Sequence, residues 1–174
     1  MSGSAYRMLD SLEGKARLLA RALAAGGLTV LLALAAMMLV DGLARSLFGQ
    51  PLDAVRDLSG VLAAISIASC VPMALLRHSN VTIRLLGSFF SGRVTRIGDT
   101  AAAVLVCVVI GGMAVEMLSY AQKVMHAGEA TWMLNIPTAP FWYFVGGALS
   151  CAFLVQLLVV ARTFRAFAIE RSAH

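Results

Sequence analysis

The stretch ALAAGGLTVLLALAAMMLV, residues 22–40, contains no charged residue. At a rise of about 1.5 Å per residue, a helix of about 20 apolar residues crosses a hydrocarbon core about 30 Å thick. Three further stretches lack charged residues in the same way, namely residues 58–76, 100–115 and 130–161. The sequence therefore predicts four membrane-spanning helices.

Composition agrees with this prediction. Hydrophobic residues make up 60% of the 174 residues and charged residues only 13%, whereas soluble domains carry about 25% charged residues. We therefore predict an all-α integral membrane protein with no separate soluble domain. Its predicted parts are an N-terminal segment (1–21), a membrane domain (22–162, with spans at about 22–44, 55–77, 97–122 and 137–162) and a tail (163–174).

The first apolar run resembles a signal peptide in one respect, because Lys15, Arg17 and Arg21 precede it. A signal peptide, however, has an apolar core of only about 7–15 residues. The run over residues 22–40 is longer, and three further runs follow it. We therefore interpret it as the first span.

The basic residues predict the orientation of the spans. All but three of the 14 Lys and Arg residues lie in the N-terminal segment, between the second and third spans, or in the tail; the exceptions are Arg45, Arg56 and Lys123. Short basic loops stay in the cytoplasm. Both termini and the middle connection are thus predicted to be cytoplasmic. The net charge of +5 then needs no nucleic-acid partner, because no basic face interleaved with aromatic residues is visible.

Two amphipathic segments flank the spans. Apolar residues recur every three or four positions from Ala5 to Leu19, which predicts a helix on the cytoplasmic membrane surface. A similar pattern predicts a short interfacial helix over residues 80–92, with a plain connecting loop as the alternative.

Small residues and one proline mark the expected contacts between spans. Gly60, Ala64 and Ala68 recur every four residues in the second span, which is typical of close helix packing. Pro72 removes a helical hydrogen bond and predicts a kink. Glycine pairs stand at 26–27, 111–112 and 146–147.

Glu116 is an acidic residue well inside the predicted third span, and a carboxylate at membrane depth is by default a functional candidate. A coupling-ion role is one possibility. Snorkelling to the outer surface, or pairing with Lys123 or with a basic residue of a partner, are the others.

Catalytic and cofactor motifs are not visible. Cys70, Cys107 and Cys151 form no CxxC pair, and His78, His126 and His174 are too scattered to hold a haem between helices. We expect no enzyme activity, no metal site and no cofactor. A helper subunit that packs on a larger partner fits better than two alternatives, a small homo-oligomeric transporter or channel and a membrane anchor of a redox complex.

Several short motifs carry a family resemblance. Asp41 and Arg45 stand four residues apart, Phe48-Gly49-Gln50-Pro51 and Asp57 follow, and Arg77 and Leu134-x-Ile136-Pro137 come later. In this order, over about residues 23–162, they resemble the small membrane subunit (DctQ type) of tripartite ATP-independent periplasmic (TRAP) transporters. The family usually has His, Asp and Glu where Asn80, Arg84 and Asp57 stand, so these departures weaken any role implied for the three positions more than they weaken the family resemblance.

The resemblance implies a scaffold subunit in the bacterial inner membrane. Its implied partners are a large multi-span subunit (DctM type), which carries the substrate and sodium sites, and a periplasmic solute-binding protein (DctP type). The implied process is ion-gradient-driven uptake of an organic acid or related carboxylated solute, whose identity this chain does not reveal. Structural or interface roles are implied for Asp41, Arg45, Gly49, Pro51, Asp57, Arg77 and Pro137.

The four-residue spacing of Asp41 and Arg45 adds a prediction of its own. Residues four apart share a helical face, so we expect a pair at the outer boundary that holds the turn or contacts the partner. Two independent snorkelling charges are the alternative.

Overall fold

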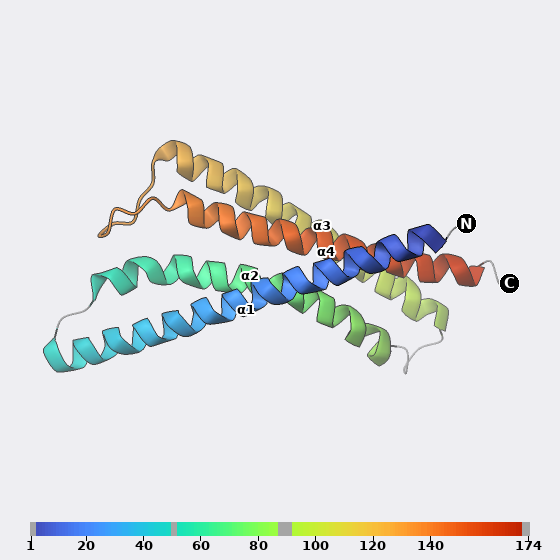
Figure 1. Cartoon of the computed structure of the whole chain (residues 1–174), viewed down its shortest axis with the longest axis horizontal. Helices are drawn as coiled ribbons and strands as arrows, with labels where there is room; N and C mark the ends of the chain where they lie inside the picture. Colours follow the sequence, from blue (N-terminus) through green and yellow to red (C-terminus); the bar gives the residue numbers. More distant parts are fainter. Residues whose placement is uncertain (1–2, 50–51, 87–91, 172–174) are drawn as a thin grey trace.

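A computed structural model of the chain describes residues 3–49, 52–86 and 92–171. It contains four long helices, α1 (Gly3–Phe48), α2 (Asp53–Leu86), α3 (Gly92–Ala127) and α4 (Ala139–Arg171) (Figure 1). Each is long and apolar enough to cross a membrane, over Gly14–Phe48, Asp53–Arg77, Thr100–Ala127 and Ala139–Ala161. The prediction of an all-α protein with four membrane-spanning helices is confirmed.

The start of α1, the end of α2, the start of α3 and the end of α4 lie at one end of the molecule, which we call the termini end (Figure 1). The end of α1, the start of α2 and the loop between α3 and α4 lie at the opposite end, which we call the loop end (Figure 1). This arrangement places the ends of the helices as the four-span prediction requires. The side of the membrane that each end faces stays a prediction.

The two predicted interfacial helices are not separate elements. α1 is one helix of 46 residues, about 69 Å long at about 1.5 Å per residue, and it includes the segment 5–19 without a break. The physical reason is composition, because this segment contains no proline and is rich in Ala, Leu, Met, Lys and Arg, which are strong helix formers.

α2 likewise continues to Leu86, so residues 80–86 extend the second span's helix. The remaining positions of the predicted interfacial helix include 87–91, which lie outside the described residues. No glycine or proline stands between Arg77 and Leu86, so nothing in the backbone ends the helix there. α2 also continues through Pro72 and bends along its length (Figure 1).

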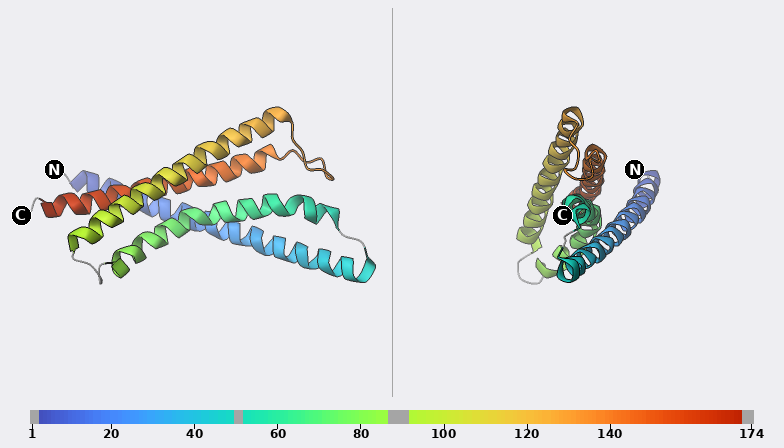
Figure 2. Two further views of the ribbon diagram at one scale, coloured as in Figure 1. Left: turned by 180° about the vertical axis from the view of Figure 1, so that it is seen from behind. Right: turned by 90° about the vertical axis from the view of Figure 1, so that its left-hand side faces the viewer.

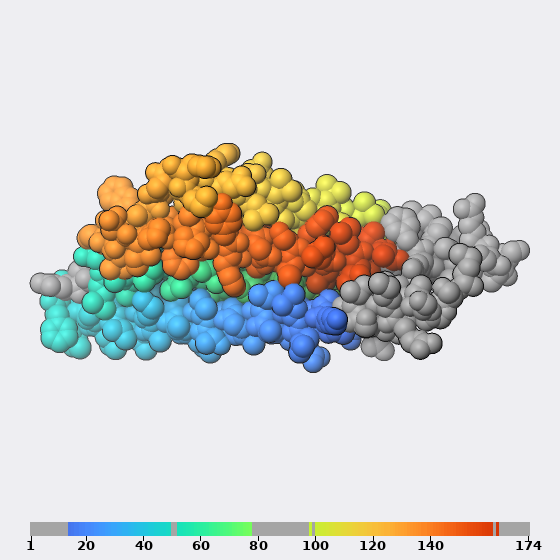
Figure 3. Space-filling view, turned by 45° about the horizontal axis from the view of Figure 1, so that its top comes forward, coloured from blue at the N-terminus to red at the C-terminus, as the bar shows by residue number. Residues whose placement is uncertain are grey.

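The helices pack in the spatial order α1, α2, α4, α3 rather than as a closed square. α1 packs on α2, α2 on α4 and α4 on α3, whereas α1 and α3 do not touch in the described ranges (Figure 2). In the space-filling view α1 and α3 form opposite long margins of the molecule (Figure 3). Only 11% of the apolar segment of α1 and of α3 is buried, against 28% in α2 and 39% in α4.

α1 and α3, which we call the edge helices, each bury a narrow stripe of residues that recur every seven positions. Over residues 14–48 of α1, where burial is described, the buried residues are Ala20, Gly27 and Leu34, and in α3 the buried positions include Cys107, Ala114 and Ala121. A seven-residue repeat keeps one stripe of a helix against one neighbour. Each edge helix therefore has one main packing partner, α2 for α1 and α4 for α3, and a broad outer face.

In each glycine pair, one glycine faces a neighbouring helix and the other faces the outer surface. A Cβ atom on Gly27 would lie 2.7 Å from the Ser69 Cβ atom, one on Gly111 2.8 Å from the Phe153 ring, and one on Gly146 2.7 Å from a Leu118 methyl group. Gly26, Gly112 and Gly147 have nothing within 4 Å. One glycine of each pair thus allows close helix contact, and the other opens onto the surface.

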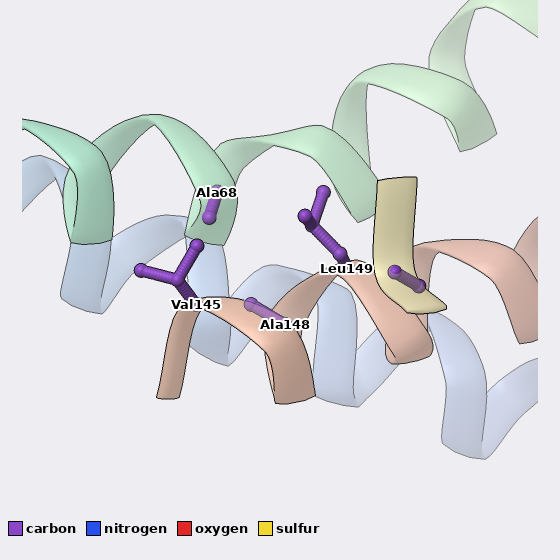
Figure 4. Packing of buried hydrophobic residues seen from close by; sticks show 5 residues of the cluster. Ala68, Val145, Ala148 and Leu149 are labelled. Carbon is purple, nitrogen blue, oxygen red and sulfur yellow. The ribbon is translucent and has the colours of Figure 1, made fainter. Parts of the chain in front are cut away.

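A small central cluster joins the two hairpins, α1–α2 and α3–α4. Val145, Ala148 and Leu149 of α4 pack with Ala68 of α2 and Ala114 of α3 (Figure 4). Ala64 is partly buried against this cluster, as the small-residue pattern predicted. Gly60 is exposed and has open space around it, so the prediction that Gly60 belongs to the packing face is wrong.

Candidate functional site: carboxylates at the loop end

Asp41 and Arg45 form the predicted pair in the last turns of α1. The Arg45 Nη2 atom lies 3.3 Å from the Asp41 Oδ2 atom. The Arg45 side chain is 59% exposed and that of Asp41 19%. An ion pair this open to its surroundings contributes at most about 1 kcal/mol, so the pair by itself explains little of the carboxylate's role.

The second oxygen of Asp41 makes the stronger contact. Asp41 Oδ1 accepts a hydrogen bond from the Leu52 N–H at 2.6 Å. Leu52 directly precedes α2, and the N-terminus of a helix has unpaired N–H groups and a partial positive charge. The carboxylate therefore ties the end of α1 to the start of α2.

Gly49 ends α1 in a way that suits this turn. Its N–H donates to the Arg45 carbonyl oxygen at 3.1 Å, and its φ angle is 70°. A positive φ at the residue after a helix is the usual glycine C-cap, which other residues adopt only with strain. Pro51, the other turn residue of the motif, lies outside the described residues.

Asp57 makes a contact that the sequence did not predict. Its Oδ2 atom accepts hydrogen bonds from the Met133 N–H at 2.7 Å and the Leu134 N–H at 3.2 Å. Asp57 belongs to α2, whereas Met133 and Leu134 lie in the loop between α3 and α4, which bends toward the start of α2 (Figure 1). One carboxylate thus joins the two hairpins at the loop end.

The loop starts with a well-formed helix end. The Gly128 N–H donates to the Met125 carbonyl at 3.3 Å and the Glu129 N–H to the Val124 carbonyl at 3.2 Å. Gly128 has a φ of 65°. This pair of bonds is the Schellman arrangement, in which a glycine reverses the chain after a helix.

The rest of the loop is closed by backbone pairing. Ala130 and Pro137 form an antiparallel bridge, and the Thr131 N–H donates to the Ile136 carbonyl at 2.9 Å. The buried Thr131 hydroxyl accepts from the Ile136 N–H at 3.1 Å. The predicted interface residue Pro137 is therefore part of the base of a closed loop, whose far tip carries the amides held by Asp57.

Large apolar side chains project from this tip. Trp132 is 99% exposed, Met133 63% and Leu134 41%. Exposed apolar groups on a loop that is held in place by hydrogen bonds are typical of contact surfaces. We call residues 132–134 the loop tip.

Gln156 is a second polar feature that sequence reasoning missed. Its side chain is 4% exposed, and its Nε2 atom donates to the Ala103 carbonyl oxygen of α3 at 3.0 Å. A buried amide must be paired inside a membrane, and this one joins α4 to α3. The sequence does mark this residue, because Gln156 is the one amide side chain between residues 139 and 161. An amide carries no charge, so it does not interrupt the uncharged stretch that predicts the span.

Two predicted residues remain without a contact. Glu116 is exposed on α3 and makes no hydrogen bond or ion pair with any described residue. Lys123 lies two turns away, so of the alternatives for Glu116 the pair with Lys123 is not formed. Arg77 is exposed near the termini end. In the described ranges, no group of three or more His, Cys, Asp or Glu residues is placed to hold a metal ion.

Asp41 and Asp57, whose carboxylates make these contacts, are also among the residues that carry the family resemblance. The model of the DctQ component of tripartite ATP-independent periplasmic transporters matches residues 34–165. This chain belongs to that family. The match includes Asp41, Asp57 and the whole α3–α4 loop. No curated protein and no solved structure matches the chain.

Membership identifies the chain as a small membrane subunit of a TRAP transporter. The family is one of transporter components, not of enzymes. The contacts of Asp41 and Asp57 therefore belong to the architecture of a DctQ component. In this member they connect the helices at the loop end.

Proposed function

We propose that this DctQ component is a scaffold that braces the large, multi-span DctM-type subunit of its transporter. The large subunit would perform ion-gradient-driven uptake of an organic acid or related carboxylated solute. The observation that carries the proposal is the open row of helices, because α1 and α3 each leave a broad face unused by the chain itself.

The orientation of the scaffold follows from its charges. The termini end would lie in the cytoplasm and the loop end in the periplasm of a bacterial inner membrane, because basic residues concentrate at the termini end. The loop tip would then face the compartment of the solute-binding protein. We propose that Trp132 and Met133 offer that DctP-type protein a preformed contact.

The experiment that tests the scaffold role uses the complete transporter. Deletion of this chain is expected to abolish uptake driven by a sodium gradient, and the tagged chain is expected to co-purify with the large subunit. Normal uptake without the chain would refute the proposal. Solute flux through liposomes that contain the purified chain alone would favour an independent transporter instead.

A further inference from the structure

Glu116 lies within the apolar, membrane-spanning part of α3. Its neighbours Ala114 and Met117 pack in and against the central cluster. Glu116 also falls near the middle of the membrane-spanning part of α3, Thr100–Ala127. Eleven positions separate it from the end of that segment, about 16 Å along a helix, and seven separate it from Lys123, about 10 Å.

The Glu116 side chain is exposed there, on the side of α3 that does not contact α4. An ionised carboxylate that faces lipid at this depth costs several kcal/mol, so acidic residues in spans almost always face protein or water and are paired. The described part of the chain supplies no such pair. The missing group must therefore come from another molecule.

The surface around Glu116 suits a helix as that molecule. Gly112, one turn away, has open space where a Cβ atom would stand. Leu105, Val109 and Met113 are 65%, 51% and 50% exposed on the same side of the helix. A glycine beside a polar group, framed by apolar side chains, lets a neighbouring backbone approach closely enough for interhelical hydrogen bonding.

The outer face of α1 differs in the relevant respect. Its exposed residues include Leu28, Leu32 and Leu39, and no charged residue occurs from 22 to 40. Lipid can cover such a face at no electrostatic cost. The outer face of α3 carries the Glu116 carboxylate, which lipid chains cannot pair.

We propose that the outer face of α3 around Gly112 and Glu116 is covered by a helix of the large membrane subunit, which presents a basic side chain to the Glu116 carboxylate. The inference rests on the proposed scaffold function and assigns its interface. A second copy of this chain is a poor occupant, because a two-fold symmetric contact through this face would bring two Glu116 carboxylates together. Lipid head groups lie nearer the membrane surface than Glu116.

Photo-crosslinking in the intact complex tests the location. A photoreactive residue is placed at Leu105 or Val109 on α3, and at the matched exposed positions Leu32 or Leu39 on α1. We expect the large subunit to be captured from the α3 positions at a yield at least about tenfold higher than from α1, since contact residues lie within side-chain reach. Capture mainly from α1, equal capture from both, or capture from neither would overturn the inference.

The unmodified chain separates this test from the test of the proposed function. If the wild-type chain does not bring down the large subunit, the scaffold function fails. If it does, and the α3 positions do not crosslink, the scaffold function stands and only the assigned face is wrong.

Substitution of Glu116 tests the charge. Glu116→Gln keeps the shape and removes the charge, and we expect recovery of the large subunit to fall about threefold, as for the loss of a typical interhelical polar contact. Glu116→Lys should lower it by more than about tenfold through like-charge repulsion. Glu129→Lys, an exposed charge reversal at the loop end, is the matched control and should leave recovery unchanged.

The yield of the small subunit in the membrane is measured alongside, so that misfolding is not mistaken for lost contact. Recovery unchanged by both Glu116 variants at normal yield would overturn the basic partner. Recovery lowered equally by Glu129→Lys would also overturn it, because the effect would then be one of overall charge.

Discussion

The middle of the membrane domain and its loop end are held together by different physics. In the middle, small residues let helices approach until Gly27 meets Ser69 and Gly146 meets Leu118. At the loop end, Asp41 and Asp57 accept hydrogen bonds from backbone N–H groups of other segments. In lipid, burying apolar surface between helices contributes little free energy, because the lipid chains are as apolar as the side chains. The closeness of fit between helix surfaces therefore decides which helices associate. Near water, by contrast, carboxylates and N–H groups can form the contacts between segments without the cost that polar groups carry inside lipid.

The largest expected effect comes from filling a close contact in the middle. Gly27→Leu places a side chain where even a Cβ atom would lie 2.7 Å from the Ser69 Cβ atom and 2.9 Å from the Ser66 carbonyl oxygen. We expect a loss of about 3 kcal/mol in the free energy of unfolding, measured by denaturant titration in detergent micelles. Gly26→Leu, its neighbour with open space, should change it by less than about 0.5 kcal/mol. Equal losses would show that α1 and α2 do not meet at Gly27.

Removal of the Asp57 carboxylate should have the next largest effect. Asp57→Ala leaves the N–H groups of Met133 and Leu134 without their acceptor, and we expect a loss of about 2 kcal/mol. Asp57→Asn keeps an oxygen acceptor and should lose about half as much. Limited proteolysis within 128–138 should quicken in the same order. Asp53→Asn, on the same helix, is the control, and cleavage as fast in it as in Asp57→Ala would contradict the assignment.

Asp41 and Arg45 allow a finer comparison within one ion pair. Asp41→Ala removes two contacts and should cost about 1 kcal/mol, whereas Arg45→Ala removes one exposed contact and should cost less than about 0.5 kcal/mol. A charge swap of the two residues restores the pair but not the acceptor for Leu52. Thermal unfolding should therefore show that the swap stays near Asp41→Ala. Full recovery would mean that the ion pair, not the hydrogen bond to Leu52, holds the turn.

The smallest effect on stability is expected at the loop tip. Trp132→Ala removes a side chain that is 99% exposed, and the free energy of unfolding should change by less than about 0.5 kcal/mol. Uptake that depends on the solute-binding protein should nevertheless fall at least about threefold if the tip carries a binding hot spot. Wild-type uptake in this variant would exclude the loop tip as the docking contact.

Much of this architecture could be predicted from local patterns. Runs without charge located the spans, and the four-residue spacing of Asp41 and Arg45 predicted a pair that the structure contains. Both depend on residues close in sequence. Residues 5–19 and 80–86 are helical but continue the helices of the spans, because a change from apolar to amphipathic pattern marks a change of surroundings and not a break in the backbone. Their position at the membrane surface stays a prediction.

The sequence by itself determined the number of spans and their approximate bounds, because hydropathy is a property of short segments. Only the tertiary structure decided that α2 and α4 are central and that Asp57 reaches an amide 76 residues away. It also decided which glycine of each pair faces a neighbour and which way Glu116 points. These features depend on how whole helices fit against one another. The shapes of side chains from two different helices must match, and the sequence of one helix alone does not show that match.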